Sequence, residues 1–119
     1  SSAVVQPIHN LGVSNTIRAG QRGWAKTLSN EVAIDGVTVN TLLPGRIHTS
    51  RVDPLDAAAA ERQGKTIEEI VRASRAAIPM GRYGRVEEFA DMAVFMLSDR
   101  AGYMTGATTC VDGGMIRSV

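Results

Sequence analysis

The segment Val37–Leu43, with the sequence Val-Thr-Val-Asn-Thr-Leu-Leu, most restricts how this chain can fold. It is rich in β-branched residues, follows the turn Asp35-Gly36 and ends at Pro44-Gly45, a pattern that predicts a strand. An apolar run of this kind is typical of a strand buried on both faces of a parallel sheet. Such a strand needs neighbours on both sides and helices above and below it.

The rest of the chain offers too few strands to meet that need. Gly106–Val111 is the only other good strand, and Ala3–Val5 has the pattern of a strand end. Helical periodicity predicts a long helix with one buried stripe and an N-cap at Ser14 or Asn15. The stripe residues are Ile17, Gly20, Trp24, Leu28 and Val32. The predicted helices span Gly12–Ala33, Ala57–Arg62, Thr66–Ala77 (with a Thr66/Glu69 capping box) and Val86–Leu97.

Helices that alternate with strands imply parallel crossovers, and therefore an α/β fold. Two strands cannot supply each other with two neighbours. The 119 residues are therefore expected to be the C-terminal part of a doubly wound parallel sheet, with further strands upstream or on another chain.

Composition excludes several functional classes. The net charge of +1 argues against nucleic-acid or membrane-surface binding through bulk charge. No apolar run approaches the ~18 residues of a membrane span, and no secretory signal is visible. Cys110 is the single cysteine, so it offers no zinc spacing or internal disulfide and is expected to be a small buried hydrophobe. A reducing, cytoplasmic location fits these features.

Five segments resemble, in order and spacing, the C-terminal half of the short-chain dehydrogenase/reductase family. They are Ser1–Val4, Gly23–Ala33, Val37–Thr49, Ile78–Glu88 and Gly106–Gly114. The similarity covers essentially the whole chain and is strongest to the 3-oxoacyl-[acyl-carrier-protein] reductase branch of fatty acid biosynthesis. It implies a Rossmann-type domain whose N-terminal nucleotide-binding half is absent from residues 1–119.

The resemblance also implies a cofactor loop after the first strand. Pro44 fixes φ and Gly45 permits a sharp turn close to a ligand. By analogy with the family, Ile47 holds the nicotinamide amide of NADP or NAD, and Thr49 adds a hydroxyl contact. The alternative for these residues is a plain strand-to-helix turn.

The family's Tyr-x-x-x-Lys motif is altered in this sequence. The tyrosine position falls on Ser14 and the lysine position on Arg18, which share one helix face. A phenol with a pKa near ~10 can be tuned to exchange a proton, whereas an aliphatic hydroxyl is a poorer acid and Arg keeps its proton. Arg18 can still bind ribose hydroxyls. Ser2, or alternatively Ser1, takes the place of the family's substrate-orienting serine.

Other acid–base candidates are few. Tyr83 and Tyr103 are the only tyrosines and are expected away from this site. His48 is the best substitute acid, because an unperturbed imidazole titrates near ~6.5. An ordinary loop histidine is the favoured interpretation of His48, and His9 is interpreted in the same way.

Two functions therefore compete. The first is an NAD(P)H-dependent oxidoreductase acting on a ketone or 3-oxoacyl thioester, with residues 50–80 as a substrate lid. The second is a catalytically degenerate homologue that serves as a nucleotide-binding or structural subunit. In either case the resemblance implies a homo-oligomer, a dimer or tetramer. The chain alone is expected to be inactive, because it contains no Gly-x-Gly-x-x-Gly phosphate loop.

Overall fold

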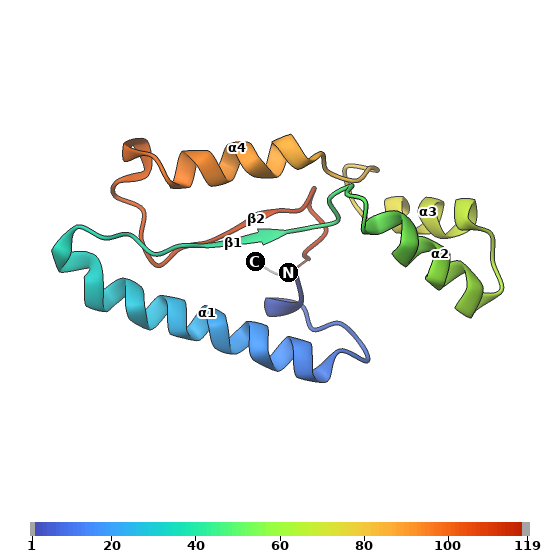
Figure 1. Cartoon of the computed structure of the whole chain (residues 1–119), viewed down its shortest axis with the longest axis horizontal. Coiled ribbons are helices and arrows are strands. Elements are labelled where there is room, and N and C mark those ends of the chain that lie inside the picture. The colour runs from blue at the N-terminus through green and yellow to red at the C-terminus, as the bar shows by residue number, and fades with distance from the viewer. Residues whose placement is uncertain (1, 118–119) are drawn as a thin grey trace.

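A computed structural model describes residues 2–117 of the chain. Two strands lie side by side between the long helix α1 on one face and α4 on the other, and α2 and α3 project beyond one end of the strands (Figure 1). The bounds are α1 Gly12–Val32, β1 Thr41–Pro44, α2 Val52–Gln63, α3 Ile67–Ala76, α4 Val86–Met96 and β2 Thr108–Val111. Short 3-10 helices occupy Ser2–Val4, Ala33–Asp35 and Asp99–Ala101.

The two strands are parallel, as the sequence predicts, and they pair from Thr41 with Thr108 to Pro44 with Val111. The first strand is shorter than predicted, because residues 37–40 are not part of it. At Asn40 the side-chain amide, instead of the backbone, bonds to the segment that leads into the second strand. Its Nδ2 donates to the Met104 carbonyl at 2.6 Å, and its Oδ1 accepts from the Ala107 N–H at 3.1 Å.

The burial predicted for the first strand is also only partly correct. Leu43 is buried, with 2% of its surface exposed, but Val37 is 51% exposed. Within residues 2–117, β2 is the only strand that pairs with β1. A strand with a single neighbour is covered by other residues on only part of its surface. For the same reason Cys110 in β2 is exposed, whereas the sequence predicts that it is buried.

The N-terminal residues form a turn of helix instead of the predicted strand end. The N–H groups of Val5 and Gln6 both donate to the Ser2 carbonyl, at 3.0 and 2.9 Å. These local bonds satisfy the backbone where no neighbouring strand of residues 2–117 is available to pair with it.

The α1 helix begins where predicted and ends one residue earlier, at Val32, and its cap and its buried face differ from the prediction. Leu11 is the N-cap residue, and Asn15 instead uses its side-chain Nδ2 to bind the Ile8 carbonyl at 2.9 Å. The predicted stripe is only partly covered: Leu28 and Val32 are half-buried, whereas Ile17 is 59% and Trp24 is 65% exposed.

The opposite face of α1 packs on the sheet. Arg22 Nε donates to Thr108 Oγ1 at 3.2 Å, and Lys26 Nζ donates to the Gly106 carbonyl at 3.3 Å. Ser29 is fully buried on this face. A Cβ at Gly106 would lie 2.6 Å from Ser29 Oγ, so glycine allows the helix to approach the sheet closely.

The helices of the 50–80 segment follow local sequence signals. The predicted capping box is confirmed, because the Glu69 N–H donates to Thr66 Oγ1 at 3.2 Å and the Thr66 N–H donates to Glu69 Oε2 at 2.9 Å. The bond from the Thr66 backbone lowers the pKa of Glu69. Gly64 ends α2 in the left-handed region with φ 60°, and the chain reverses there so that α2 and α3 pack together.

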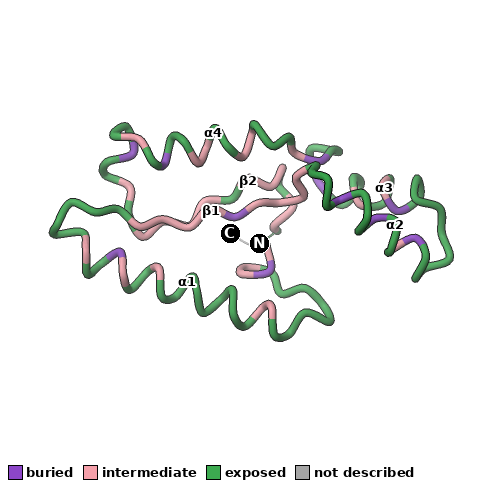
Figure 2. The backbone as a smooth tube through the Cα atoms, in the orientation of Figure 1, coloured by how far each residue is buried: buried purple, intermediate pink, exposed green. Residues whose placement is uncertain are grey.

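The molecule is more open than a self-contained domain of its size. Its radius of gyration is 16.4 Å, against about 13.5 Å expected for a compact chain of this length. Its accessible surface is 8289 Å², about 2,000 Å² more than a compact protein of this mass exposes. Buried residues are few and scattered (Figure 2). Across residues 2–117, no helix is both long and apolar enough to cross a bilayer.

Candidate cofactor and substrate site

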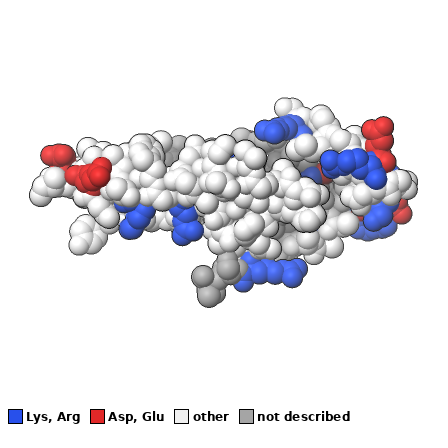
Figure 3. All heavy atoms as spheres, turned by 90° about the horizontal axis from the view of Figure 1, so that it is seen from below, with Lys and Arg blue, Asp and Glu red and all other residues white. Residues whose placement is uncertain are grey.

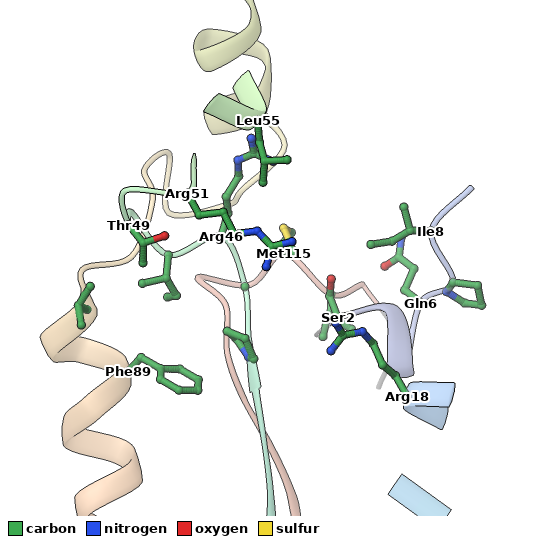
Figure 4. Close-up of a pocket in the computed structure, with 16 residues that line it drawn as sticks. Ser2, Gln6, Ile8, Arg18, Arg46, Thr49, Arg51, Leu55, Phe89 and Met115 are labelled. Carbon is green, nitrogen blue, oxygen red and sulfur yellow. The ribbon is translucent and has the colours of Figure 1, made fainter. Parts of the chain in front are cut away.

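A cavity of about 860 Å³ lies at the carboxyl ends of the two strands. This is the edge at which open parallel sheets bind ligands. Residues from both ends of the chain line it, with Ser2 and Arg18 on one side and Thr49 and Phe89 on the other (Figure 4). Six predicted site residues meet here: Ser2, Arg18, Pro44, Gly45, Ile47 and Thr49. Ser1 lies outside the described residues.

The Pro44–Thr49 loop forms one wall of this cavity and is held on two sides. The Gly45 N–H donates to the Val111 carbonyl at 2.9 Å. A Cβ on Gly45 would lie 2.5 Å from the Asp112 Cα, so only glycine fits. Beyond it, Ile47 forms a parallel bridge with Gly84.

The bridge leaves the Ile47 peptide groups free to face a ligand. The two hydrogen bonds of the bridge use the residues on either side of Ile47. The Gly84 N–H donates to the Arg46 carbonyl at 3.0 Å, and the His48 N–H donates to the Gly84 carbonyl at 2.8 Å. In such a bridge, the middle residue's own N–H and C=O point away from the partner strand. One donor and one acceptor at Ile47, beside the cavity, match what a carboxamide requires.

Arg18 is placed between Ser2 and Ser14. Its side chain extends from the start of α1 toward Ser2 (Figure 4), while its Nε donates to Ser14 Oγ at 3.1 Å. Ser14 itself does not line the main cavity. It lines a shallower depression beside α1, together with Ile17 and Arg18.

The charge of the main cavity is one-sided. Arg18, Arg46 and Arg51 all line it, and among residues 2–117 no carboxylate does. Apolar side chains complete its walls, including those of Leu55, Phe89 and Met115. The cavity therefore offers cationic donors beside an apolar surface.

Arg46 belongs to a buried cluster that sequence reasoning missed. Asp56 of α2 is only 2% exposed and forms an ion pair with Arg46. The Tyr83 hydroxyl donates to Asp56 Oδ2 at 3.0 Å. The guanidinium of Arg46 also lies over the Tyr83 ring, 5.3 Å from its centroid. Residues this far apart in sequence carry no local signal that would join them.

The other acid–base candidates lie outside the cavity. His48 is exposed, with its Nε2 3.3 Å from Asp53 Oδ1, and it is not among the cavity residues. Tyr83 is buried in the Asp56 cluster, and Tyr103 is fully exposed. Both tyrosines therefore lie away from Ser14 and Arg18, as predicted.

A second ion pair holds the loop that carries Gly84. Arg82 donates to Glu88 from both terminal nitrogens, at 2.8 and 2.7 Å, and the Arg85 N–H donates to Glu88 Oε2 at 2.8 Å. The hydrogen bonds from Arg82 lower the pKa of Glu88 to about 2. In return, the pKa of Arg82 is raised. This pair fixes the start of α4 next to the bridge at Ile47.

Comparisons with known proteins agree with this architecture. A family model described as enoyl-(acyl carrier protein) reductase matches residues 1–116. The 3-oxoacyl-[acyl-carrier-protein] reductase of Rickettsia conorii is 39% identical over 97% of this chain and 44% of its own.

Two solved structures superpose closely. The NADPH-dependent reductase YwfH, involved in bacilysin biosynthesis, gives a TM-score of 0.91 at 29% identity, over 98% of this chain and 44% of its own. L-sorbose reductase from Gluconobacter frateurii, complexed with NADPH and L-sorbose, gives a TM-score of 0.89 at 30% identity, over 98% of this chain and 45% of its own.

The chain belongs to the short-chain dehydrogenase/reductase family. Its fold is the C-terminal half of that family's Rossmann-type domain, which confirms the predicted fold class. The chain spans less than half the length of the relatives it matches. The curated relatives that it matches include several 3-oxoacyl-[acyl-carrier-protein] reductases.

Proposed function

We propose that this chain is the C-terminal half of an NAD(P)H-dependent short-chain oxidoreductase that reduces a ketone or a 3-oxoacyl thioester. The observation that carries the proposal is the cavity at the strand ends. It combines the Pro44–Thr49 loop with Ser2 and Arg18, although these segments lie far apart in sequence. The surface excess of the chain agrees with a second half that packs on it.

The residues present suit the nicotinamide end of such a cofactor. Ile47 offers one peptide donor and one acceptor for the carboxamide, Thr49 offers a hydroxyl, and Arg18 offers guanidinium N–H groups to ribose hydroxyls. When bound, the cofactor supplies a hydride. Ser2, which lines the same cavity, orients the carbonyl oxygen of the substrate by a hydrogen bond.

The reaction also needs a proton for the carbonyl oxygen, and among residues 2–117 those that line the cavity include no carboxyl group, imidazole, phenol, amine or thiol to donate it. Ser14 accepts a hydrogen bond from Arg18, and Arg does not release its proton. We infer that this site works slowly or through water. The same contact favours the second candidate, a catalytically degenerate subunit that retains cofactor binding.

The two projecting helices are proposed to form the substrate lid. Arg51 and Leu55 reach the cavity from the start of α2 (Figure 4). Residues 50–80 therefore contribute directly to the wall of the cavity, while α2 and α3 contact mainly each other. A lid built in this way excludes water when a substrate binds.

The outer face of α1 is proposed to be an interface between copies of this chain. Val13, Ile17 and Trp24 are 78%, 59% and 65% exposed. Figure 3 views the molecule from the side of α1 and shows a broad expanse without charge, with Lys, Arg, Asp and Glu dispersed around it. Exposed apolar patches of this kind mark interaction surfaces.

A fusion tests the proposed reaction. The residues of the R. conorii relative that precede the matched region are joined to this chain, and NADPH oxidation is followed with acetoacetyl-CoA as the thioester. Substrate-dependent oxidation that falls with Ser2→Ala supports the oxidoreductase. Cofactor binding without turnover supports the degenerate subunit that retains cofactor binding, and a folded fusion that binds neither NADPH nor NADH contradicts both candidates.

A further inference from the structure

Two arginines on the lid side of the cavity have no role in the proposed hydride transfer. Arg46 follows the Pro44-Gly45 turn, and it is among the residues that line the cavity (Figure 4). Arg51 reaches the same space from the start of α2. Neither residue is needed to bind a neutral ketone.

The Arg46 side chain is held in place from behind. Asp56, which is buried, binds its Nη2, and the Tyr83 hydroxyl binds the other oxygen of the same carboxylate at 3.0 Å. The Tyr83 ring supports the guanidinium at 5.3 Å. An arginine fixed on one edge keeps the direction of its remaining N–H groups, which lowers the entropy lost when they bind a ligand.

The remaining donors of Arg46 are incompletely satisfied. Its Nε is buried and has no hydrogen-bond partner among the described residues. A buried N–H without an acceptor is unfavourable. The Arg46 side chain as a whole is 33% exposed, so its exposed part, and not this Nε, is what a ligand in the cavity can reach.

We propose that Arg46 and Arg51 form an anion subsite that recognises a free carboxylate on the carbonyl substrate. The substrate is then an oxo acid with a short apolar body, which Leu55 and Met115 contact. Asp56 and Tyr83 act as positioning residues for Arg46. This inference rests on the proposed function, since it names the substrate class of the same cavity.

The test is a titration of the ¹⁵N-labelled fusion without cofactor. Acetoacetate and its uncharged methyl ester are added in turn, and the arginine Nε–Hε resonances report binding. We expect acetoacetate to bind at least about tenfold more tightly than the ester, the effect of one charge-assisted hydrogen bond. Arg46→Gln and Arg51→Gln should each abolish the preference, and Arg100→Gln, a distant exposed control, should retain it.

Two further variants separate positioning from folding. Arg46→Gln leaves the buried Asp56 unpaired and can unfold the protein. The double variant Arg46→Gln with Asp56→Asn removes both charges and replaces it if Arg46→Gln does not fold. Arg51 is exposed, so Arg51→Gln does not disturb the core. Tyr83→Phe should weaken acetoacetate binding while the affinity for the ester stays the same. A merely structural tyrosine would change both affinities equally or neither.

Equal affinity for acid and ester overturns the inference. It is also overturned if the arginine variants weaken NADPH binding by the fusion and leave its acetoacetate binding intact, because the arginines would then serve cofactor phosphates. The titration measures no turnover. An inactive fusion would therefore contradict the proposed reaction without affecting the carboxylate preference.

Discussion

Arg18 donates a hydrogen bond from Nε to the hydroxyl oxygen of Ser14 at 3.1 Å. These two residues stand where the family resemblance places a tyrosine and a lysine. Their contact is a hydrogen bond to a hydroxyl that is a poor acid, made by a group that keeps its charge. The two side chains keep the spacing of the family's motif but differ from it in chemistry, and for this reason we propose that the site can bind the cofactor without supplying the proton.

Restoring the family motif should restore the proton donor. In the fusion, Ser14→Tyr with Arg18→Lys is expected to raise the NADPH-dependent rate by about 100-fold, the lower range of what a positioned general acid contributes. Arg18→Lys alone should give no gain, because the lysine then has no phenol to tune. Steady-state kinetics at 340 nm measure both, and an unchanged rate in the double variant would show that the site uses other chemistry.

The cofactor loop should tolerate no side chain at Gly45. A Cβ there meets the Asp112 backbone at 2.5 Å, so Gly45→Ala is expected to destabilise the protein by about 1–3 kcal/mol through overpacking. Gly23→Ala is the matched control, since a Cβ at this helical position meets nothing within 4 Å. It should stabilise by about 0.5–1 kcal/mol. Thermal unfolding compares the two, and equal melting temperatures would refute the close approach.

The Arg82–Glu88 ion pair predicts an acid-sensitive contribution to stability. The pKa of Glu88 is lowered from 4.5 to about 2 in the folded protein. A lowered pKa means that this stabilisation is complete above pH 4.5 and is lost as the pH falls toward 2. Glu88→Gln should therefore lower the melting temperature at pH 7. Between pH 5 and pH 2 the melting temperature of this variant should fall less than that of the wild-type protein. Parallel curves for the two proteins would show that the pair contributes nothing.

The open face of α1 should drive self-association. Trp24→Glu places a charge in the middle of the exposed apolar stripe and is expected to lower the average mass of the fusion in light scattering after size exclusion. Ile34→Glu is the control, because Ile34 is 90% exposed but lies in the 3-10 helix that follows α1. A wild-type monomer at all concentrations would rule out this interface.

Sequence patterns predicted what depends on local contacts. The Thr66/Glu69 box follows from a short-range rule, the parallel pairing of the strands follows from the alternation of helices and strands along the chain, and both are confirmed. The meeting of Ser2 with the Pro44–Thr49 loop could be predicted only through the family resemblance, because no local rule joins residues so distant.

The failures are non-local. Periodicity showed that α1 has an apolar stripe, but it could not show that Arg22 and Lys26 on the opposite face bind the sheet. The burial of Asp56 depends on Arg46 and Tyr83 from two other segments. The predicted burial of the first strand assumed neighbours that residues 2–117 do not provide.

The central claim is that residues 1–119 hold the substrate side of a cofactor-dependent site and need a second half to work. The most direct test compares NADPH oxidation, with acetoacetyl-CoA or with acetoacetate as the substrate, by the purified 119-residue chain and by the fusion, at equal concentration. The chain alone should show no turnover and no tight NADPH binding, while the fusion should bind NADPH and oxidise it. Clear turnover by the chain alone would contradict the account.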